Sequence, residues 1–200
     1  MEKSLKEALK HRRSYYALGN VTNLPDETIE AILDEAVLHT PSAFNSQSTR
    51  LVLLLREHHR KFWEIVRRTL QKIVPPQAFA ATEAKIDKSF AAGHGTILFF
   101  EDNTVVEDLR KKFPSYSERF PVWSQQTSAM HQLVVWTMLE DAGFGASLQH
   151  YNPLIDEEVR TAWQLPQDWT LVAQMPFGRP LEAPGKKEYK PLADRIRVFK

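Results

Sequence analysis

Cysteine is absent from this chain of 200 residues. Its absence excludes disulfides, thiol nucleophiles, thiolate zinc sites and cysteine-ligated iron–sulfur clusters. No apolar run approaches the roughly 20 residues that a membrane-spanning helix needs, so we expect no membrane partner. Residues 1–6 are charged and lack the apolar segment of a secretory signal, so we expect a cytoplasmic protein.

A surplus of charge of either sign is also missing. Lys and Arg number 26 and Asp and Glu 25, which gives a formal net charge of +1. This balance offers no electrostatic reason to expect nucleic acid as a partner. The hydrophobic content of 42% is sufficient for a compact core, and no repeat or linker divides the chain. We therefore expect one domain over residues 1–200.

Several motifs that would indicate other chemistry are missing as well. Gly93-x-Gly95 and Gly143-x-Gly145 each lack the third glycine of the dinucleotide fingerprint, which disfavours a Rossmann site. No Gly-x-Ser-x-Gly elbow is present to anchor acyl transfer. His58 and His59 are adjacent, and side chains at i and i+1 point apart on a helix, so no metal site is predicted.

The apolar residues that are present predict a mixture of helices and strands. Periodicity and end signals predict helices over residues 2–13, 25–39, 58–74, 77–92, 105–112, 123–142 and 156–164. Strands are expected over 50–56, 96–100 and 169–177, of which the first two are continuous apolar runs typical of strands buried on both faces. Residues 123–142 are apolar around most of the helix, which indicates burial in a core or a subunit interface.

Proline and glycine mark the segments between these elements and after them. Pro114 and Pro121 bracket a stretch that we expect to be a loop. The tail after Gly178 is rich in proline, glycine and lysine until residues 196–199, which could pair as an edge strand. Because that strand has little stability of its own, we expect it to lie on another subunit.

Arg12-Arg13-Ser14 ends the first predicted helix and is a candidate phosphate site. Two guanidiniums offer rigid forks of donors and the serine adds a short hydroxyl. Lys187 in the tail could close on the same phosphate. Alone, the motif could equally be a basic helix end that complements the helix dipole.

Two further polar segments could contact a heterocyclic ring. Ser42, Asn45 and Gln47 follow a helix that Pro41 ends, and they supply hydroxyl and amide groups, although such residues also form ordinary loops. The stretch 145–153, Gly-Ala-Ser-Leu-Gln-His-Tyr-Asn-Pro, follows the longest helix, and alone it could be a helix cap with an Asn-Pro turn.

In this order along the chain, the three segments resemble the flavin-binding motifs of the nitroreductase family. The run Leu148–Pro153 resembles its short, fatty-acid-repression-mutant-like branch. The resemblance implies an α+β fold in which helices flank a mostly antiparallel central sheet. It also implies an intertwined homodimer with the C-terminal tail exchanged between subunits, and two FMN molecules at the interface that both chains touch.

The resemblance implies an FMN-dependent NAD(P)H oxidoreductase with a ping-pong mechanism. NADH or NADPH would pass a hydride to the flavin and leave, and a small-molecule acceptor such as a nitroaromatic or quinone would be reduced in its place. Because the flavin carries the chemistry, no side chain is assigned as catalytic. His150 could donate a proton or could merely pack.

The resemblance also assigns roles to residues. Phosphate contacts fall to Arg12, Arg13, Ser14 and Lys187. The ring and ribityl chain are assigned to Ser42, Asn45 and Gln47, of which Gln47 reaches flavin held mainly by the partner subunit. The reactive edge of the ring is assigned to Leu148 and Gln149, and the acceptor pocket to Phe44, Tyr116 and Tyr151.

A second interpretation is a non-catalytic flavin-binding regulatory dimer that acts in lipid or redox signalling. The implied branch has been linked to the regulation of lipid metabolism. Rapid reduction by NAD(P)H distinguishes the enzyme from the regulator, because a binding protein need not be reduced quickly.

Overall fold

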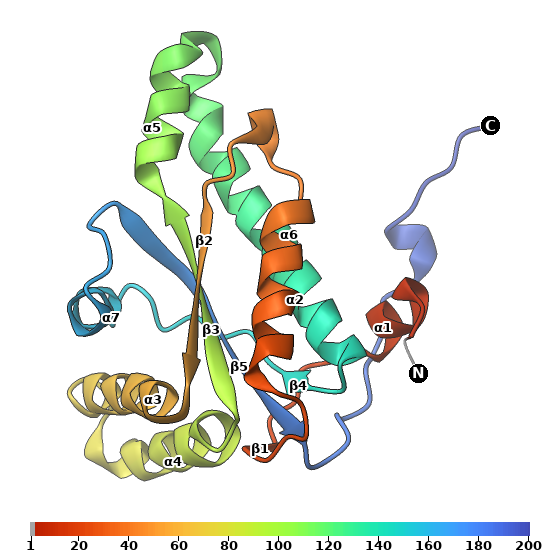
Figure 1. Cartoon of the computed structure of the whole chain (residues 1–200). Helices are drawn as coiled ribbons and strands as arrows, with labels where there is room; N and C mark the ends of the chain where they lie inside the picture. Colours follow the sequence, from red (N-terminus) through yellow and green to blue (C-terminus); the bar gives the residue numbers. More distant parts are fainter. Residues whose placement is uncertain (1–2) are drawn as a thin grey trace.

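A sheet with antiparallel strand pairings forms the centre of the protein in a computed structural model that describes residues 3–200 (Figure 1). The strand order is β1 (Leu18–Gly19), β5 (Trp169–Pro180), β3 (Gly95–Asp102) and β2 (Thr49–Leu55). A further short strand, β4 (Gly145–Ala146), pairs with β5. The predicted α+β fold with a mostly antiparallel sheet is confirmed.

Helices cover both faces of this sheet. One face carries α2 (Asp26–His39) and α6 (Phe120–Asp141), with α1 (Leu5–His11) packed beyond α6 (Figure 1). The other face carries α3 (Arg56–Gln71), α4 (Pro76–Ile86) with the π-helical turn η2 (Asp87–Ala91), and α7 (Asp156–Trp163). The helix α5 (Asn103–Lys112), the 3-10 helix η3 (Pro114–Arg119) and the start of α6 extend past one end of the sheet.

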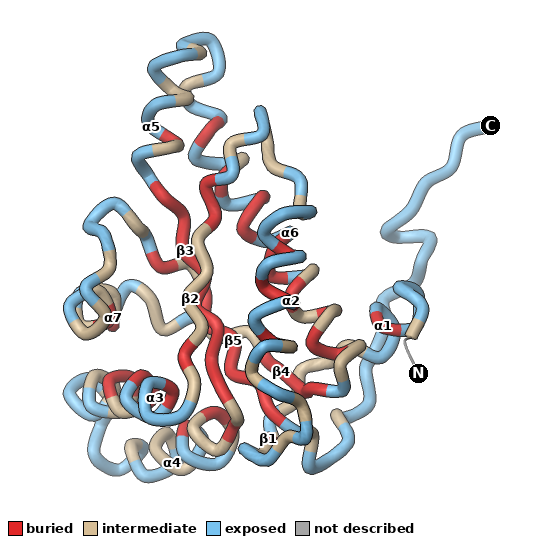
Figure 2. The backbone as a smooth tube through the Cα atoms, viewed as in Figure 1, coloured by how far each residue is buried: buried red, intermediate tan, exposed pale blue. Residues whose placement is uncertain are grey.

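Strand β3 separates two hydrophobic cores because its side chains alternate between the faces. Ile97 and Phe99 pack under α2 and α6, whereas Leu98 and Phe100 pack under α3 and α7. Every residue of β3 is buried, and Figure 2 shows this as a continuous red segment at the centre. The sequence prediction of a strand buried on both faces is therefore confirmed for β3.

The same prediction was wrong for β2. Its residues 50–53 are only half buried, because in the described part of the chain β2 pairs with β3 alone and forms an edge of the sheet. An apolar run shows that a strand is covered but does not show whether its own chain covers it. Leu51 and Leu53 instead face a hollow between β2 and α2.

Several predicted boundaries also differ from the structure. The bracketed segment 114–121 is η3 and the first turn of α6, since proline is well tolerated at a first helical position. The predicted helix 77–92 changes to π geometry after Ile86. The first helix, Leu5–His11, is shorter than the predicted range 2–13, of which residue 2 lies outside the described part. Residues 196–199 form no strand within this chain, and the tail runs exposed past α1 (Figure 2).

Candidate functional site

A cleft of about 560 Å³ lies between the end of α1 and residues 182–187 of the tail. Its lining includes Arg12, Arg13, Ser14 and Lys187, so the structure brings together the residues predicted to contact a phosphate. The cleft is therefore rich in donors and in positive charge.

The two arginines of the cleft have no carboxylate partner among residues 3–200. Burial and then the charge of the neighbouring Arg13 lower the pKa of Arg12, and the charge of Glu140 offsets this in part. The Arg12 guanidinium lies over the Trp136 ring at 4.3 Å from its centroid. Arg13 donates from Nη2 to the Gly185 carbonyl at 2.6 Å. An anion in the cleft would relieve the repulsion between these adjacent cations.

The cationic cleft adjoins the strand that leads to Leu148 and Gln149. Ser14 forms a parallel bridge with Ala146, and the Tyr15 amide donates to the Ala146 carbonyl at 3.0 Å. An ion pair of 3.0 Å between Lys3 Nζ and Glu140 Oε1 holds the start of the chain against the end of α6. The first and third predicted motifs are thus neighbours in space.

Gln174, on β5, fixes the segment that follows β4. Its backbone exchanges two hydrogen bonds with Gln149, at 2.7 and 2.9 Å. Its fully buried side chain accepts from the Tyr151 amide at 2.7 Å and donates to the Asn152 amide oxygen at 3.1 Å. The Ser147 and Gln149 amides donate to β5. Because successive N–H groups of extended backbone alternate in direction, the Leu148 amide points away from β5.

The second motif is a loop of unusual backbone conformation around the 3-10 turn η1 (Ala43–Asn45). Phe44, Asn45 and Gln47 have φ values of 56°, 50° and 49°, in the left-handed region. Such conformations cost about 1–3 kcal/mol each in residues other than glycine, and they persist where surrounding contacts impose them. One such contact is internal, because Ser42 Oγ accepts from the Gln47 amide at 3.0 Å.

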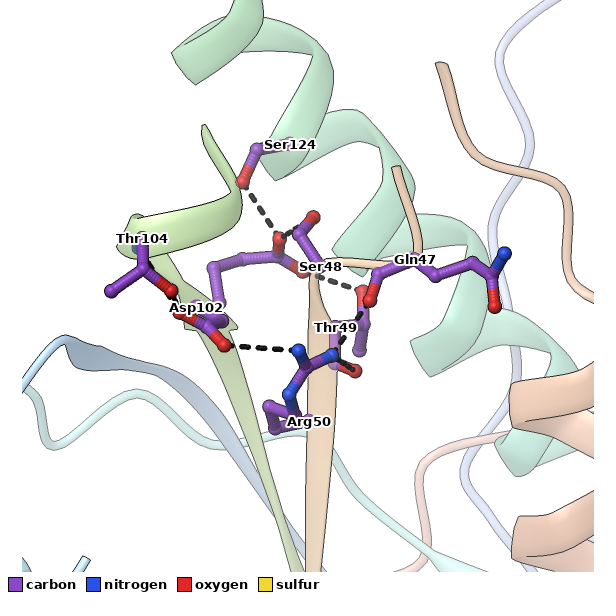
Figure 3. A network of polar contacts seen from close by, with 8 residues as sticks. Gln47, Ser48, Thr49, Arg50, Asp102, Thr104 and Ser124 are labelled. Carbon is purple, nitrogen blue, oxygen red and sulfur yellow. Dashed lines mark hydrogen bonds and ion pairs between the residues drawn. The ribbon is translucent and has the colours of Figure 1, made fainter. Parts of the chain in front are cut away.

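Two adjacent carboxylates at the end of β3 meet the residues that follow this loop (Figure 3). Glu101 accepts hydrogen bonds from the hydroxyls of Ser48, Thr49 and Ser124 at 2.6, 2.5 and 2.7 Å. Asp102 pairs with the Arg50 guanidinium at 2.9 Å. Burial raises the pKa of Asp102, but the hydrogen bonds from Thr104 and the charge of Arg50 outweigh this effect and hold the pKa below its ordinary value.

Phe44 and Tyr116, two of the three residues predicted for an acceptor pocket, lie in one aromatic cluster. Phe44 stacks on Trp123, with ring centroids 5.7 Å apart, and lies 5.8 Å from Tyr116. Phe113 and Phe120 complete the cluster. Phe44 and Tyr116 are about half exposed, so the cluster presents an aromatic surface to solvent.

Tyr151, the third of these residues, does not join that cluster. Its ring packs edge-on against Trp63 and Phe90 in the core on the other face of the sheet. Burial raises the pKa of Tyr151 to about 12. Within this chain its position is that of a core residue.

The aromatic cluster and the cationic cleft lie at opposite parts of α6. Phe44 contacts Trp123, whereas Arg12 contacts Trp136, thirteen residues later on the same helix. At 1.5 Å per residue this separation is about 20 Å. One chain therefore brings the first and third motifs together and leaves the loop 42–47 remote from both.

Sequence reasoning missed Glu101, Gln174 and Trp136. A glutamine inside the apolar run of β5 and an acidic pair directly after the apolar run of β3 were visible signals, because buried polar groups need partners. The stacking of Arg12 on Trp136 had no local signal. Within residues 3–200, no group of three His, Asp or Glu side chains is arranged to hold a metal, and no helix is both long and apolar enough to cross a bilayer.

Comparisons with known proteins agree with this architecture. A family model described as the nitroreductase family matches residues 9–179. Two proteins of Saccharomyces cerevisiae are similar in sequence. HBN1 is 35% identical over 197 residues, covering 96% of this chain and 95% of its own, and nitroreductase FRM2 is 32% identical over 190 residues, covering 91% of each chain.

Solved structures of nitroreductases are similar to this chain as well. Nitroreductase CinD from Lactococcus lactis has been solved in complex with 4-nitrophenol and with chloramphenicol. It is 44% identical to this chain, and the match covers 98% of this chain and 100% of CinD with a TM-score of 0.89.

Proposed function

Because the chain belongs to the nitroreductase family, we propose that it is an FMN-dependent NAD(P)H oxidoreductase that reduces nitroaromatic or quinone-like acceptors. An oxidoreductase of the nitroreductase type follows from the family itself. Similarity to FRM2, fatty acid repression mutant 2, confirms the branch that the motifs indicated. The cationic cleft beside residues 146–149 is the observation that most supports a bound FMN.

The donors of the cleft suit a phosphate monoester. Arg12, Arg13, Ser14 and Lys187 line it, and no ion pair within residues 3–200 neutralises either guanidinium. Arg12 is held on Trp136, so its fork of donors is oriented before a ligand arrives. We assign the phosphate of FMN to these four residues.

The ring would lie along the segment that leaves β4. The Leu148 amide, which points away from β5, is the donor that we assign to the electron-rich edge of the reduced ring, beside Gln149. When bound, FMN would supply two-electron redox chemistry, taking a hydride from NADH or NADPH and passing it to the acceptor in a ping-pong sequence. The protein would position the ring and exclude water.

The loop 42–47 lies too far from the cleft to serve the same FMN within one chain. We therefore propose a homodimer in which Ser42, Asn45 and Gln47 of one chain reach a flavin whose phosphate the other chain holds. The aromatic cluster with Phe44 and Tyr116 would then cover the acceptor. The nitrophenyl ligands of the CinD complexes support a flat aromatic acceptor.

Half-buried apolar residues of β2, exposed ones of α2 and the exposed tail support the same assembly. The hollow between α2 and β2, of about 620 Å³, has an apolar lining of Leu33, Val37, Leu38, Leu51 and Leu53 beside the polar Glu30, Asp34, Thr49 and Arg50. Ile196, Val198 and Phe199 of the tail are largely exposed in the single chain. We propose that the tail of one subunit covers such surface on the other, because a sheet edge accepts a further strand.

Titration with FMN tests the binding part of this proposal. We expect uptake of about one FMN per chain, with the absorption spectrum of a flavoprotein. A colourless preparation that takes up no added FMN, although folded, would contradict the proposal.

A further inference from the structure

Glu101 is a buried acid that the proposed chemistry does not use. Its residue is 1% exposed, and three hydroxyl groups donate to its carboxylate. Two donors, Ser48 and Thr49, follow the loop 42–47 directly, and the third, Ser124, lies on α6 next to Trp123 of the aromatic cluster. The carboxylate thus links the end of the loop to the helix that carries the cluster.

Asp102 holds the same segment from the neighbouring position on β3. Its carboxylate pairs with Arg50 Nη2 at 2.9 Å, and Arg50 Nη1 donates to the Gln47 carbonyl at 2.6 Å. Two hydrogen bonds from Thr104, at 2.5 and 3.0 Å, hold Asp102 in turn. Figure 3 shows Asp102 and Arg50 beside Gln47. The Ser48 and Ser124 hydroxyls in the same view donate to the carboxylate of Glu101, which is drawn without a label.

The loop between these contacts needs external support. Three of its residues have left-handed backbone conformations, and none of the three is glycine. Its internal closure within the described chain is the bond from the Gln47 amide to Ser42 Oγ together with the turn bonds of η1. The strongest contacts at its C-terminal end are those to the two acids, because hydrogen bonds to charged groups exceed neutral ones.

We propose that Glu101 and Asp102 are positioning residues, which hold the loop 42–47 in the conformation that contacts the flavin ring and ribityl chain. Glu101 acts through Ser48 and Thr49, and Asp102 acts through Arg50. Neither acid touches the cofactor. The inference rests on the proposed function, because it assumes that Ser42, Asn45 and Gln47 bind flavin.

Affinities for two flavins separate this role from the phosphate contacts. FMN and riboflavin share the ring and ribityl chain, but riboflavin lacks the phosphate. Glu101→Gln should weaken both ligands by the same factor, about tenfold, because a charged acceptor is lost on the ring side only. Arg13→Ala should instead weaken FMN and leave riboflavin unchanged.

Smaller changes keep the test valid if Glu101→Gln does not fold. Ser124→Ala removes one donor outside the loop and should weaken both flavins about threefold, whereas Ser124→Thr retains the hydroxyl and should restore parental affinity. Thr96→Val is the matched control, because it removes a buried hydroxyl on the other face of the sheet. It should lower thermal stability without changing either affinity.

The outcomes distinguish the inference from the function on which it rests. A folded parent that binds neither flavin overturns the proposed function. A parent that binds both, with the Glu101 or Ser124 variants within twofold of it, overturns the inference alone. A loss of flavin affinity in Thr96→Val as large as in the Glu101 and Ser124 variants would also overturn the inference. The losses would then follow from lower stability and not from a changed position of the loop.

Discussion

Arg12 and Arg13 are adjacent, but their surroundings differ. Arg12 is partly buried against Trp136, so its side chain contributes to the packing of α1 on α6. Within residues 3–200, the Arg13 side chain makes one hydrogen bond, to the carbonyl of Gly185 in the exposed tail. Loss of Arg13 should therefore affect ligand binding more than folding.

Arg13→Ala should weaken FMN binding about ten- to hundredfold, because a charge-assisted phosphate contact contributes roughly 1.5–3 kcal/mol. Fluorescence titration with FMN measures the change. Lys72→Ala is the control, since Lys72 is an exposed cation at the end of α3 and far from the cleft in sequence. Equal affinity of Arg13→Ala and parent would remove Arg13 from the phosphate site.

His59 is buried in a chain of hydrogen bonds that specifies its neutral form. Trp63 Nε1 donates to Thr96 Oγ1 at 2.9 Å, the Thr96 hydroxyl meets His59 Nδ1 at 2.9 Å, and His59 Nε2 meets the Ala91 carbonyl at 3.2 Å. Every donor in this series of hydrogen bonds has an acceptor when the proton of the neutral His59 ring is on Nε2. Burial lowers the pKa of His59 to about 4.

Acidification should therefore destabilise the fold through His59. In the unfolded chain His59 is protonated below its pKa of 6.5, whereas in the native state it stays neutral down to about pH 4. Because the unfolded state binds more protons between these two pKa values, the free energy of unfolding falls as pH falls from 6.5 to about 4. Urea unfolding at about pH 7 and about pH 4.5 should show a loss about 2 kcal/mol larger for the parent than for His59→Gln. Equal losses would mean that His59 is not buried in its neutral form.

At the scale of elements, the junction of α1 with α6 orients the cleft. The ion pair of Lys3 with Glu140 and the stacking of Arg12 on Trp136 join the two helices. Trp136→Leu should weaken FMN binding about fivefold, because a cation–π contact contributes about 1 kcal/mol, whereas Trp136→Phe should keep most of the affinity. Indistinguishable affinities of the two variants in the FMN titration would show that the ring face does not orient Arg12.

Elements governed by local signals were predictable from the sequence. The apolar run of β3, the amphipathic α2 and the long α6 agree with their predicted positions within a few residues. The edge position of β2 was not predictable, because hydrophobicity reports that a surface is covered and not which chain covers it.

In the candidate site, too, some placements were predictable from the sequence and others were not. Arg12, Arg13, Ser14 and Lys187 share a cleft as the resemblance implied, whereas Tyr151 lies in the core on the opposite face. The face of the sheet on which Tyr151 lies depends on how the residues after β4 pair with β5. No local pattern in residues 147–153 encodes that pairing.

At the scale of the whole molecule, residues 196–199 of the tail are left exposed by the single chain. Val198 is 71% exposed, so in a monomer Val198→Asp should have almost no effect on stability. In the proposed homodimer, the new carboxylate should weaken dimerisation by at least about tenfold, because an unpaired charge would be buried. Analytical ultracentrifugation over a dilution series measures the change.

Ile73→Asp is the matched control for the tail variant. Ile73 is 56% exposed at the end of α3, on the face of the sheet away from β2's hollow. It should leave the dimer unchanged. A Val198→Asp protein as dimeric as the parent would show that residues 196–199 are not covered by a second subunit.

In the proposed enzyme, paired chains hold a flavin that accepts and returns electrons. Anaerobic stopped-flow mixing of the FMN-loaded protein tests it most directly, first with NADH or NADPH and then with 4-nitrophenol or a quinone. We predict rapid bleaching of the flavin absorbance by a nicotinamide nucleotide and its recovery on addition of an acceptor, as two separable half-reactions. A flavin that stays oxidised with both nucleotides would contradict the proposed oxidoreductase function and favour a regulatory flavin-binding protein.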